Sequence, residues 1–175
     1  MAAIYDRPRT MLEVYRCLPE GVPIQLINNQ LIMSPAPNDP HQQIIIDLSS
    51  EINFFVKKQK FGKTRVAPSD VYFNHENVFQ PDIYFVSNSN AGCFERDGFH
   101  GVPDFVIEIL SPGNKKYDEV DKFKIYEAAG VKEYWLVEPD TKTATGYINT
   151  NGRFELYKKE TGKLSSKILN TVFEF

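Results

Sequence analysis

The apolar residues of this chain change their spacing at Gly62, and this change limits the possible folds more than any other feature. From His41 to about Lys60, apolar side chains recur every three or four residues, which predicts a helix with one buried stripe. The stripe contains Ile45, Leu48, Ile52, Phe55 and Val56. After Gly62 come three runs that are rich in Val, Ile, Phe and Tyr, as strands are: TRVAPSDVYF, FQPDIYFVS and DFVIEILS. A long helix followed by several strands predicts a mixed α/β domain with a central sheet flanked by helices.

The remaining segments add helices, a further strand and a hairpin at each end. A helical pattern runs from about Tyr117 to Ala129, and the apolar run EYWLVEP that follows suits a buried strand. Residues 9–18 are predicted to form a short helix. Asn28-Asn29 and Asn151-Gly152 each lie between two strand-like runs, which predicts a hairpin at both places.

The length of 175 residues fits a single domain, and the 42% of hydrophobic residues can form a core without a metal or disulfide. Cys17 and Cys93 lie far apart, which argues against a disulfide scaffold or a structural zinc site. No apolar run approaches the roughly 18 residues of a membrane helix, and the N-terminus lacks the apolar region of a secretory signal. We expect a cytoplasmic protein without membrane contact, divided into a helix and hairpin decoration (1–40), a core (41–139) and a C-terminal hairpin (140–175).

The charges are balanced over the whole chain but not locally. The chain has 20 Lys and Arg against 23 Asp and Glu, and its isoelectric point near 5.7 argues against a protein that coats nucleic acid through its net charge. One acid-free stretch nevertheless carries five cations: Lys57, Lys58, Lys60, Lys63 and Arg65. These cations could contact phosphates, or they could form a solvated helix end, where positive charge complements the helix dipole. The sequence leaves both interpretations open.

Two acidic residues lie on or beside the predicted central strands. Glu108 lies inside the apolar run FVIEILS, where a carboxylate is costly unless it is paired, protonated or bound to a cation. Asp82 follows Pro81 at the start of the preceding strand, where an acidic residue can also cap a turn. Together, two carboxylates on neighbouring strands can hold one Mg²⁺ or Mn²⁺ ion. Such an ion activates water and stabilises the charge that develops during phosphodiester cleavage.

A phosphodiester-cleaving site also needs a positive side chain, and the sequence offers Lys122 or Lys124. The strand position two residues after Glu108 is Leu110, so either the cation comes from elsewhere, such as the helix that follows, or catalysis is weak. The two lysines are two positions apart, about 200° around a helix axis, so only one of them can face the sheet. Lys122 shares a helical face with Tyr126, and we expect its ammonium near Glu108. Replacing Lys122 by Met is expected to abolish cleavage and to leave metal binding and stability nearly unchanged. The alternative for either lysine is an exposed residue that pairs along the helix.

Several of these residues belong to a larger pattern. It consists of QPDIYFV, EILSP at 108–112, a helix with Asp118, Lys122 and Tyr126, and GVKEYWLVEP at 130–139. This pattern resembles the Uma-two family of restriction-endonuclease-like proteins, which belongs to the PD-(D/E)XK nuclease superfamily. The resemblance covers nearly the whole chain and implies a restriction-endonuclease-like fold. It also implies that Asp82 and Glu108 bind the metal and that Lys122 replaces the missing strand lysine.

The residues and the resemblance together predict a metal-dependent endonuclease that acts on DNA, with Mg²⁺ or Mn²⁺ as its cofactor. A homodimer is expected, because two symmetric sites can cut both strands of a duplex. The alternative is a catalytically inactive module on the same fold that binds nucleic acid or protein. Gln25 and Asn29 stand where the family commonly has Glu and Gly, at positions expected to lie outside the metal site. His41 is expected to form a local hydrogen bond, and Tyr126 and Trp135 to be core residues.

Overall fold

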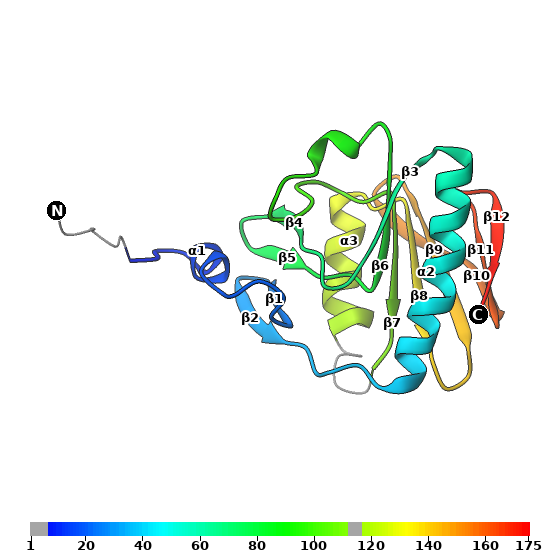
Figure 1. Cartoon of the computed structure of the whole chain (residues 1–175), viewed down its shortest axis with the longest axis horizontal. Helices are drawn as coiled ribbons and strands as arrows, with labels where there is room; N and C mark the ends of the chain where they lie inside the picture. The colour runs from blue at the N-terminus through cyan, green and yellow to red at the C-terminus, as the bar shows by residue number, and fades with distance from the viewer. Residues whose placement is uncertain (1–6, 112–116) are drawn as a thin grey trace.

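The computed structural model describes residues 7–111 and 117–175, except for the side chains of residues 117 and 118. Its centre is a six-stranded sheet with the order β10-β9-β8-β7-β6-β3 (Figure 1). The strands are β3 (Gly62–Val66), β6 (Ile83–Ser87), β7 (Phe105–Ile109), β8 (Glu133–Glu138), β9 (Thr143–Thr150) and β10 (Arg153–Thr161). β7 and β8 run parallel, and every other neighbouring pair runs antiparallel. The predicted mixed α/β architecture is confirmed.

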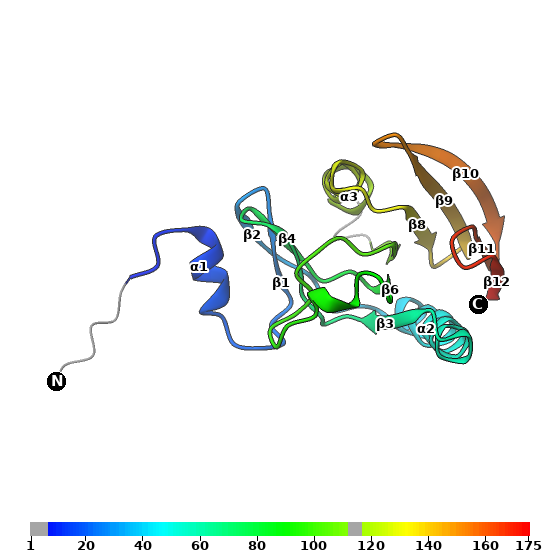
Figure 2. The ribbon, with the colours of Figure 1, turned by 90° about the horizontal axis from the view of Figure 1, so that it is seen from above.

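Helices cover both faces of this sheet, in the layers that Figure 2 shows from above. The helix α2 (Asp39–Gln59) packs on one face and α3 (Phe123–Ala129) on the other. Successive side chains of a strand point to opposite faces. Phe105 and Ile107 of β7 therefore join the core beneath α2, whereas Val106 joins the core beneath α3. The same alternation directs Glu108 toward α3, and this places a carboxylate inside the second core.

The ends of α2 follow from its local sequence. The Asn38 side chain accepts a hydrogen bond from the amide of His41 at 3.1 Å, and Lys60 ends the helix in the left-handed conformation with φ of 57°. The buried row of the helix contains His41, Ile44, Leu48, Ile52 and Val56. The predicted stripe is wrong in its first turn, because Ile44 is buried at 2% exposure and Ile45 is only partly buried. Counted from the capped turn at His41, positions three and seven residues later point toward the sheet.

A second sheet of four strands packs beside the α3 face, with the order β2-β1-β5-β4. Its strands are β1 (Ile24–Ile27), β2 (Gln30–Met33), β4 (Val71–Asn74) and β5 (Asn77–Phe79). The prediction of one strand in TRVAPSDVYF is wrong, because the run divides between β3 of the central sheet and β4 of this sheet. Pro68 lies between them and has no amide hydrogen for a strand ladder. The short helix α1 (Met11–Arg16) packs on this sheet through Leu12 and Tyr15.

Two hairpins follow the core. The first joins β9 to β10 through Asn151 and Gly152, whose φ angles of 53° and 84° are both positive, as a two-residue hairpin turn requires. Because β9 also pairs with β8, this hairpin extends the central sheet rather than standing apart from it. The sequence did not predict the second hairpin, β11 (Lys163–Ser166) with β12 (Thr171–Glu174).

A buried carboxylate ties this last hairpin to the core. Glu133 of β8 is 0% exposed and accepts hydrogen bonds from the Trp135 indole at 2.6 Å and from the Ile168 amide at 2.8 Å. Burial raises the pKa of Glu133, although the hydrogen bonds oppose this shift. In the part of the chain that the structure describes, no helix combines the length and the hydrophobicity needed to cross a bilayer.

Candidate active site

The two acids predicted from the sequence lie opposite each other on neighbouring strands. Ile83 pairs with Ile107 in the antiparallel ladder of β6 and β7, so Asp82, the residue before β6, lies opposite Glu108. Opposed residues in such a ladder have Cβ atoms about 4.5–5.5 Å apart. The amide of Asp82 also approaches Oε2 of Glu108 at 3.4 Å. The register of two adjacent strands therefore brings both carboxyl groups to one place.

Lys122 and Tyr126 bind the Glu108 side chain from the helical layer above. A π-helical segment, Tyr117–Lys122, leads into α3 and places these two residues about one turn apart. The Lys122 ammonium lies 2.9 Å from Oε1 of Glu108, and the Tyr126 hydroxyl donates to the same oxygen at 2.6 Å. Glu108 and Lys122 are 2% and 3% exposed, so their charges form a buried ion pair. A buried ion pair needs such additional hydrogen bonds to offset its loss of hydration.

Asp82 is held by a strand amide and a histidine. Its Oδ2 accepts a hydrogen bond from the amide of Ile109 at 2.7 Å and lies 3.3 Å from Nε2 of His41. Burial lowers the pKa of His41, but the hydrogen bond and charge of Asp82, with the charge of Glu108, outweigh it and raise the pKa above its ordinary value. His41 is only 6% exposed, and its Nδ1 has no hydrogen-bond partner among the described residues. The imidazole therefore fixes the carboxylate of Asp82 from the first turn of α2.

The described contacts fall on particular oxygens of the two carboxyl groups. The Ile109 amide and the His41 imidazole contact Oδ2 of Asp82. The Lys122 ammonium and the Tyr126 hydroxyl contact Oε1 of Glu108, and the Asp82 amide lies 3.4 Å from Oε2. The two neighbouring carboxyl groups are the candidate ligands for a cation. Oxygen ligands of this kind suit Mg²⁺ and Mn²⁺. The residues present thus fit the divalent ion that the family resemblance implies.

A cavity of about 370 Å³ gives access to these groups. The first turn of α2, the proline-rich loop 34–37 and the N-terminal hairpin form its wall, together with Asp82, Glu108 and Lys122. Gln25 of β1 also lines the cavity, where it accepts from the Gln80 amide at 3.0 Å and donates to the Ser34 hydroxyl at 2.8 Å. Gln25 thus lines the cavity through contacts with Gln80 and Ser34, and its expected place outside the metal site stays a prediction. The N-terminal segment contributes to the site wall as well as decorating the core.

The structure brings Asp82, Glu108 and Lys122 together, whereas Lys124 is exposed on the other side of α3. The side chain of Asp118 lies outside the described residues.

Sequence reasoning missed His41 and Tyr126 as members of the site. The four-residue spacing from Lys122 to Tyr126 was a usable signal for the tyrosine. The signal for the histidine was weaker. His41 is a polar side chain in the first turn of α2, and it is the first residue of the buried row of that helix.

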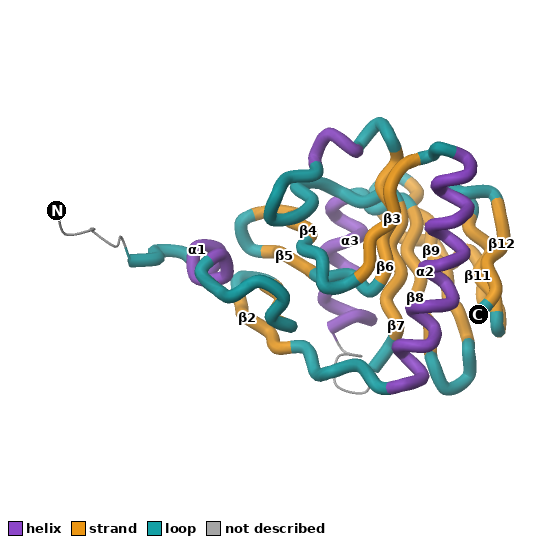
Figure 3. The backbone as a smooth tube through the Cα atoms, in the orientation of Figure 1, coloured by secondary structure: helices purple, strands orange, loops and turns teal. Residues whose placement is uncertain are grey.

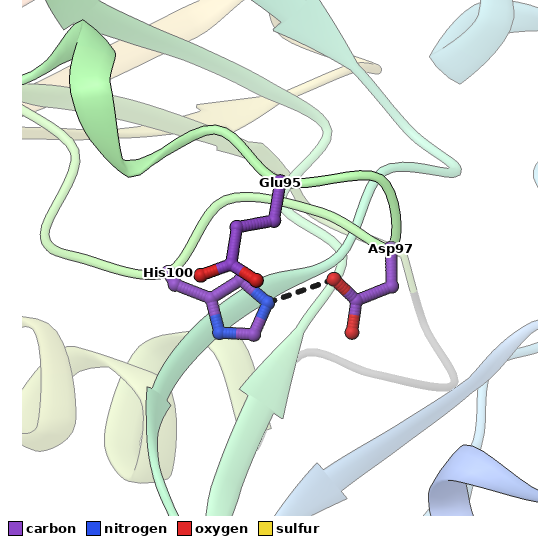
Figure 4. A group of neighbouring side chains, drawn as sticks. All are labelled: Glu95, Asp97 and His100. Atoms are coloured by element: carbon purple, nitrogen blue, oxygen red, sulfur yellow. Dashed lines mark hydrogen bonds and ion pairs between the residues drawn. The ribbon is translucent and has the colours of Figure 1, made fainter.

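A second polar group lies on the loop between β6 and β7 (Figure 4). One ligand atom each of Glu95, Asp97 and His100 lies within 4.8 Å of the others, and Nε2 of His100 is 2.9 Å from Oδ1 of Asp97. The imidazole stacks on Tyr72 with a centroid distance of 4.3 Å. Burial favours a raised pKa for Asp97, but the hydrogen bonds from His100 and from its own amide, with the charges of His100 and Arg16, together outweigh burial and lower the pKa. The ion pair and the ring stacking account for this arrangement without a ligand.

Comparison with known proteins agrees with the geometry. Residues 12–172 match the Uma2 family, whose description reads "Putative restriction endonuclease". The chain belongs to the Uma2 family. Because the match spans nearly all of the chain, it includes the β1–β2 and β9–β10 hairpins as well as the residues of the Asp82–Glu108 site.

A solved structure shows the same fold as this Uma2 protein. It is described as a "putative nuclease belonging to DUF820" from Anabaena variabilis ATCC 29413. The two chains superpose with a TM-score of 0.76 and 25% sequence identity, over 93% of this chain and 92% of the other. The restriction-endonuclease-like fold expected from the resemblance is thereby confirmed. No curated protein matches the sequence.

Proposed function

We propose that this protein is a divalent-metal-dependent endonuclease that hydrolyses phosphodiester bonds of DNA. The observation that carries the proposal is the Asp82–Glu108 pair, which lines a cavity. The buried ammonium of Lys122 lies 2.9 Å from Oε1 of Glu108. In this assignment the carboxylates of Asp82 and Glu108 would hold Mg²⁺ or Mn²⁺. The bound ion would supply Lewis-acid stabilisation of the charge on a phosphoryl oxygen.

The protein's own residues have separate roles in this proposal. Lys122 is the positive group of the reaction and orients the attacking water or stabilises the developing negative charge. The Tyr126 hydroxyl holds Glu108 through Oε1, so that its other oxygen keeps a fixed direction. His41 and the Ile109 amide hold Asp82 in the same way through Oδ2. The two carboxylates thus enter the reaction already oriented, which avoids reorganisation when the substrate arrives.

Metal binding and cleavage test the proposal separately. Calorimetry with Mn²⁺ should detect binding to the wild-type protein that is lost in Asp82→Asn, because one of two carboxylate ligands is neutralised. Plasmid DNA should be cut with Mg²⁺ or Mn²⁺ but not with a chelator. Glu108→Gln and Asp82→Asn should each slow cleavage by a factor of about 100 or more, the usual cost of losing a charge-stabilising group.

The exposed neighbour Lys124 provides the matched control for these experiments. Lys124→Met should cut at the wild-type rate, because its side chain points away from Glu108. Cleavage that survives in Asp82→Asn and Glu108→Gln would assign the activity to another site or to a contaminant. Metal binding without any cleavage of duplex or single-stranded DNA would favour the catalytically inactive binding module.

A further inference from the structure

We propose that the basic strip formed by Lys57, Lys58, Lys60, Lys63 and Arg65 is the surface along which the DNA backbone leaves the active site. This inference rests on the proposed nuclease function and adds the path of the substrate. It commits to a phosphodiester strand as the occupant of the strip.

The strand β3 connects the strip directly to the active site. β3 pairs antiparallel with β6, so Val66 lies beside Ile83 and Arg65 beside Tyr84. The amide of Ala67, just after β3, donates to the carbonyl of Asp82 at 3.2 Å. In Figure 3 the tube runs from the end of α2 into β3, which lies beside β6. A strand that leaves the Asp82–Glu108 site over β3 therefore meets Arg65 first, then Lys63, and then the lysines at the end of α2.

The two cations of β3 are held together at the surface by one aromatic ring. Lys63 and Arg65 are exposed and, being two residues apart, lie on the same face of the strand about 6.6 Å from each other along it. The ammonium of Lys63 and the guanidinium of Arg65 each lie 4.8 Å from the ring centroid of Phe94. Cation–π contacts of this kind restrict long side chains that would otherwise move freely. The result is a preformed pair of positive groups beside the active site.

The strip has no internal charge compensation. Within residues 7–111 and 117–175, none of its five cations lies within 4.0 Å of a carboxylate oxygen. The protein as a whole has a net charge of −3, so this concentration of unpaired cations is a local feature. A helix dipole accounts for Lys57 and Lys58 in the last turn of α2. It does not account for Lys63 and Arg65, which lie on a strand beyond the helix.

Exposed aromatic side chains accompany the cations. Phe54 is 69% exposed and Phe61 44% exposed, and the Lys58 ammonium lies 5.9 Å from the Phe54 ring. Basic grooves with interspersed aromatic rings are typical of surfaces that follow a nucleic acid strand. A competing explanation exists, because β3 is an edge strand and charged residues on edges prevent unwanted strand pairing. The two explanations predict different results when the charges are removed.

Salt-dependent DNA binding distinguishes them. The measurement is fluorescence anisotropy of a labelled duplex and a labelled single strand, in a Glu108→Gln background that does not cut, between about 50 and 200 mM salt. Lys63→Gln and Arg65→Gln should each weaken binding and lower the slope of log affinity against log salt by about 0.9 on duplex or about 0.7 on single strands. The double variant should lose about twice as much slope. The form of DNA, duplex or single strand, whose salt slope falls by its own expected amount is the form that follows the strip.

The opposite edge of the central sheet supplies the matched control. Arg153 and Lys159 are also exposed and lie on β10, the other edge strand. Arg153→Gln and Lys159→Gln should leave the salt slope unchanged. An equal loss of salt slope for the β3 variants and the β10 variants would overturn the inference. Strip variants that bind DNA as tightly as the parent protein and gain mass in light scattering would also overturn it. The latter result would assign Lys63 and Arg65 to edge protection.

The outcomes separate this inference from the proposed function. Wild-type protein that cuts DNA while the strip variants bind and cut normally would refute the path and leave the nuclease assignment intact. Strip-dependent binding without cleavage by the wild-type protein would support the path and refute the catalytic assignment.

Discussion

At the scale of single residues, the buried pair of Lys122 and Glu108 has consequences for stability as well as for chemistry. Both side chains are 3% exposed or less. Lys122→Met would remove the Lys122 cation from the buried Glu108 carboxylate, and breaking a buried ion pair typically costs about 3–5 kcal/mol of stability. The free energy of unfolding in urea should fall by this amount, and the expectation of nearly unchanged stability is revised accordingly.

Two further variants test the reason for this loss. Adding Glu108→Leu to Lys122→Met should restore much of the stability, because no buried charge then lacks a partner. Lys124→Met, on the exposed side of the same helix, should change stability by less than about 0.5 kcal/mol. A double variant as unstable as Lys122→Met alone would show that the lysine stabilises the fold through packing.

His41 supports a second prediction at this scale. Its imidazole orients Asp82 without lying among the candidate metal ligands, and residues in such supporting positions typically contribute a factor of 10 to 100 in metal affinity. His41→Ala should weaken Mn²⁺ binding by roughly this factor in calorimetry, while His41→Gln should retain part of the affinity through its amide group. Equal metal affinity in the wild-type protein and His41→Ala would remove His41 from the site.

At the scale of elements, Asp104 joins the ends of three central strands. Its carboxylate accepts from the Ser87 amide at the end of β6 at 2.8 Å and lies 2.6 Å from the Lys132 ammonium before β8. Burial favours a raised pKa, but the Lys132 and Ser87 hydrogen bonds outweigh it and lower the pKa of Asp104 below its ordinary value. The folded protein therefore stabilises the ionised form of this carboxyl group.

The sign of this shift determines the dependence on pH. A carboxyl group whose pKa is lowered on folding contributes stability above its ordinary pKa and loses that contribution as the pH falls through the folded-state value. Asp104→Asn should thus cost about 1–3 kcal/mol at neutral pH, the range for a buried hydrogen-bonded group. The difference in urea midpoint from the wild-type protein should narrow only below about pH 4. A difference that is the same at neutral and strongly acidic pH would contradict this.

At the scale of the whole molecule, the open sheet edges bear on assembly. β2 is the outer strand of the four-stranded sheet, and Met33 at its end is 71% exposed. We expect a homodimer that pairs β2 with its symmetry mate, because two such sites can cut both strands of a duplex. Light scattering should give twice the chain mass of 20.1 kDa. Met33→Asp should shift the protein toward the monomer, and a wild-type monomer at high micromolar concentration would refute the expectation.

The sequence by itself determined several elements and marked Glu108 and Lys122 as candidate site residues. Apolar spacing defined α2 to within two residues, Asn151-Gly152 defined the hairpin turn, and a carboxylate inside an apolar strand marked Glu108. The angular spacing of residues around the axis of the predicted second helix separated the buried Lys122 from the exposed Lys124. Each of these follows from side-chain periodicity within one element, which is a local property.

The tertiary structure decided which of these residues meet. The register of β6 on β7 placed Asp82 opposite Glu108, and the packing of α2 and α3 brought His41 and Tyr126 to them. It also moved Gln25 into the cavity wall and divided residues 64–73 between two sheets. Such contacts join residues that lie far apart in the chain. They depend on strand register and layer packing, which no local pattern encodes, because a shift of one residue in register moves every side chain to the opposite face.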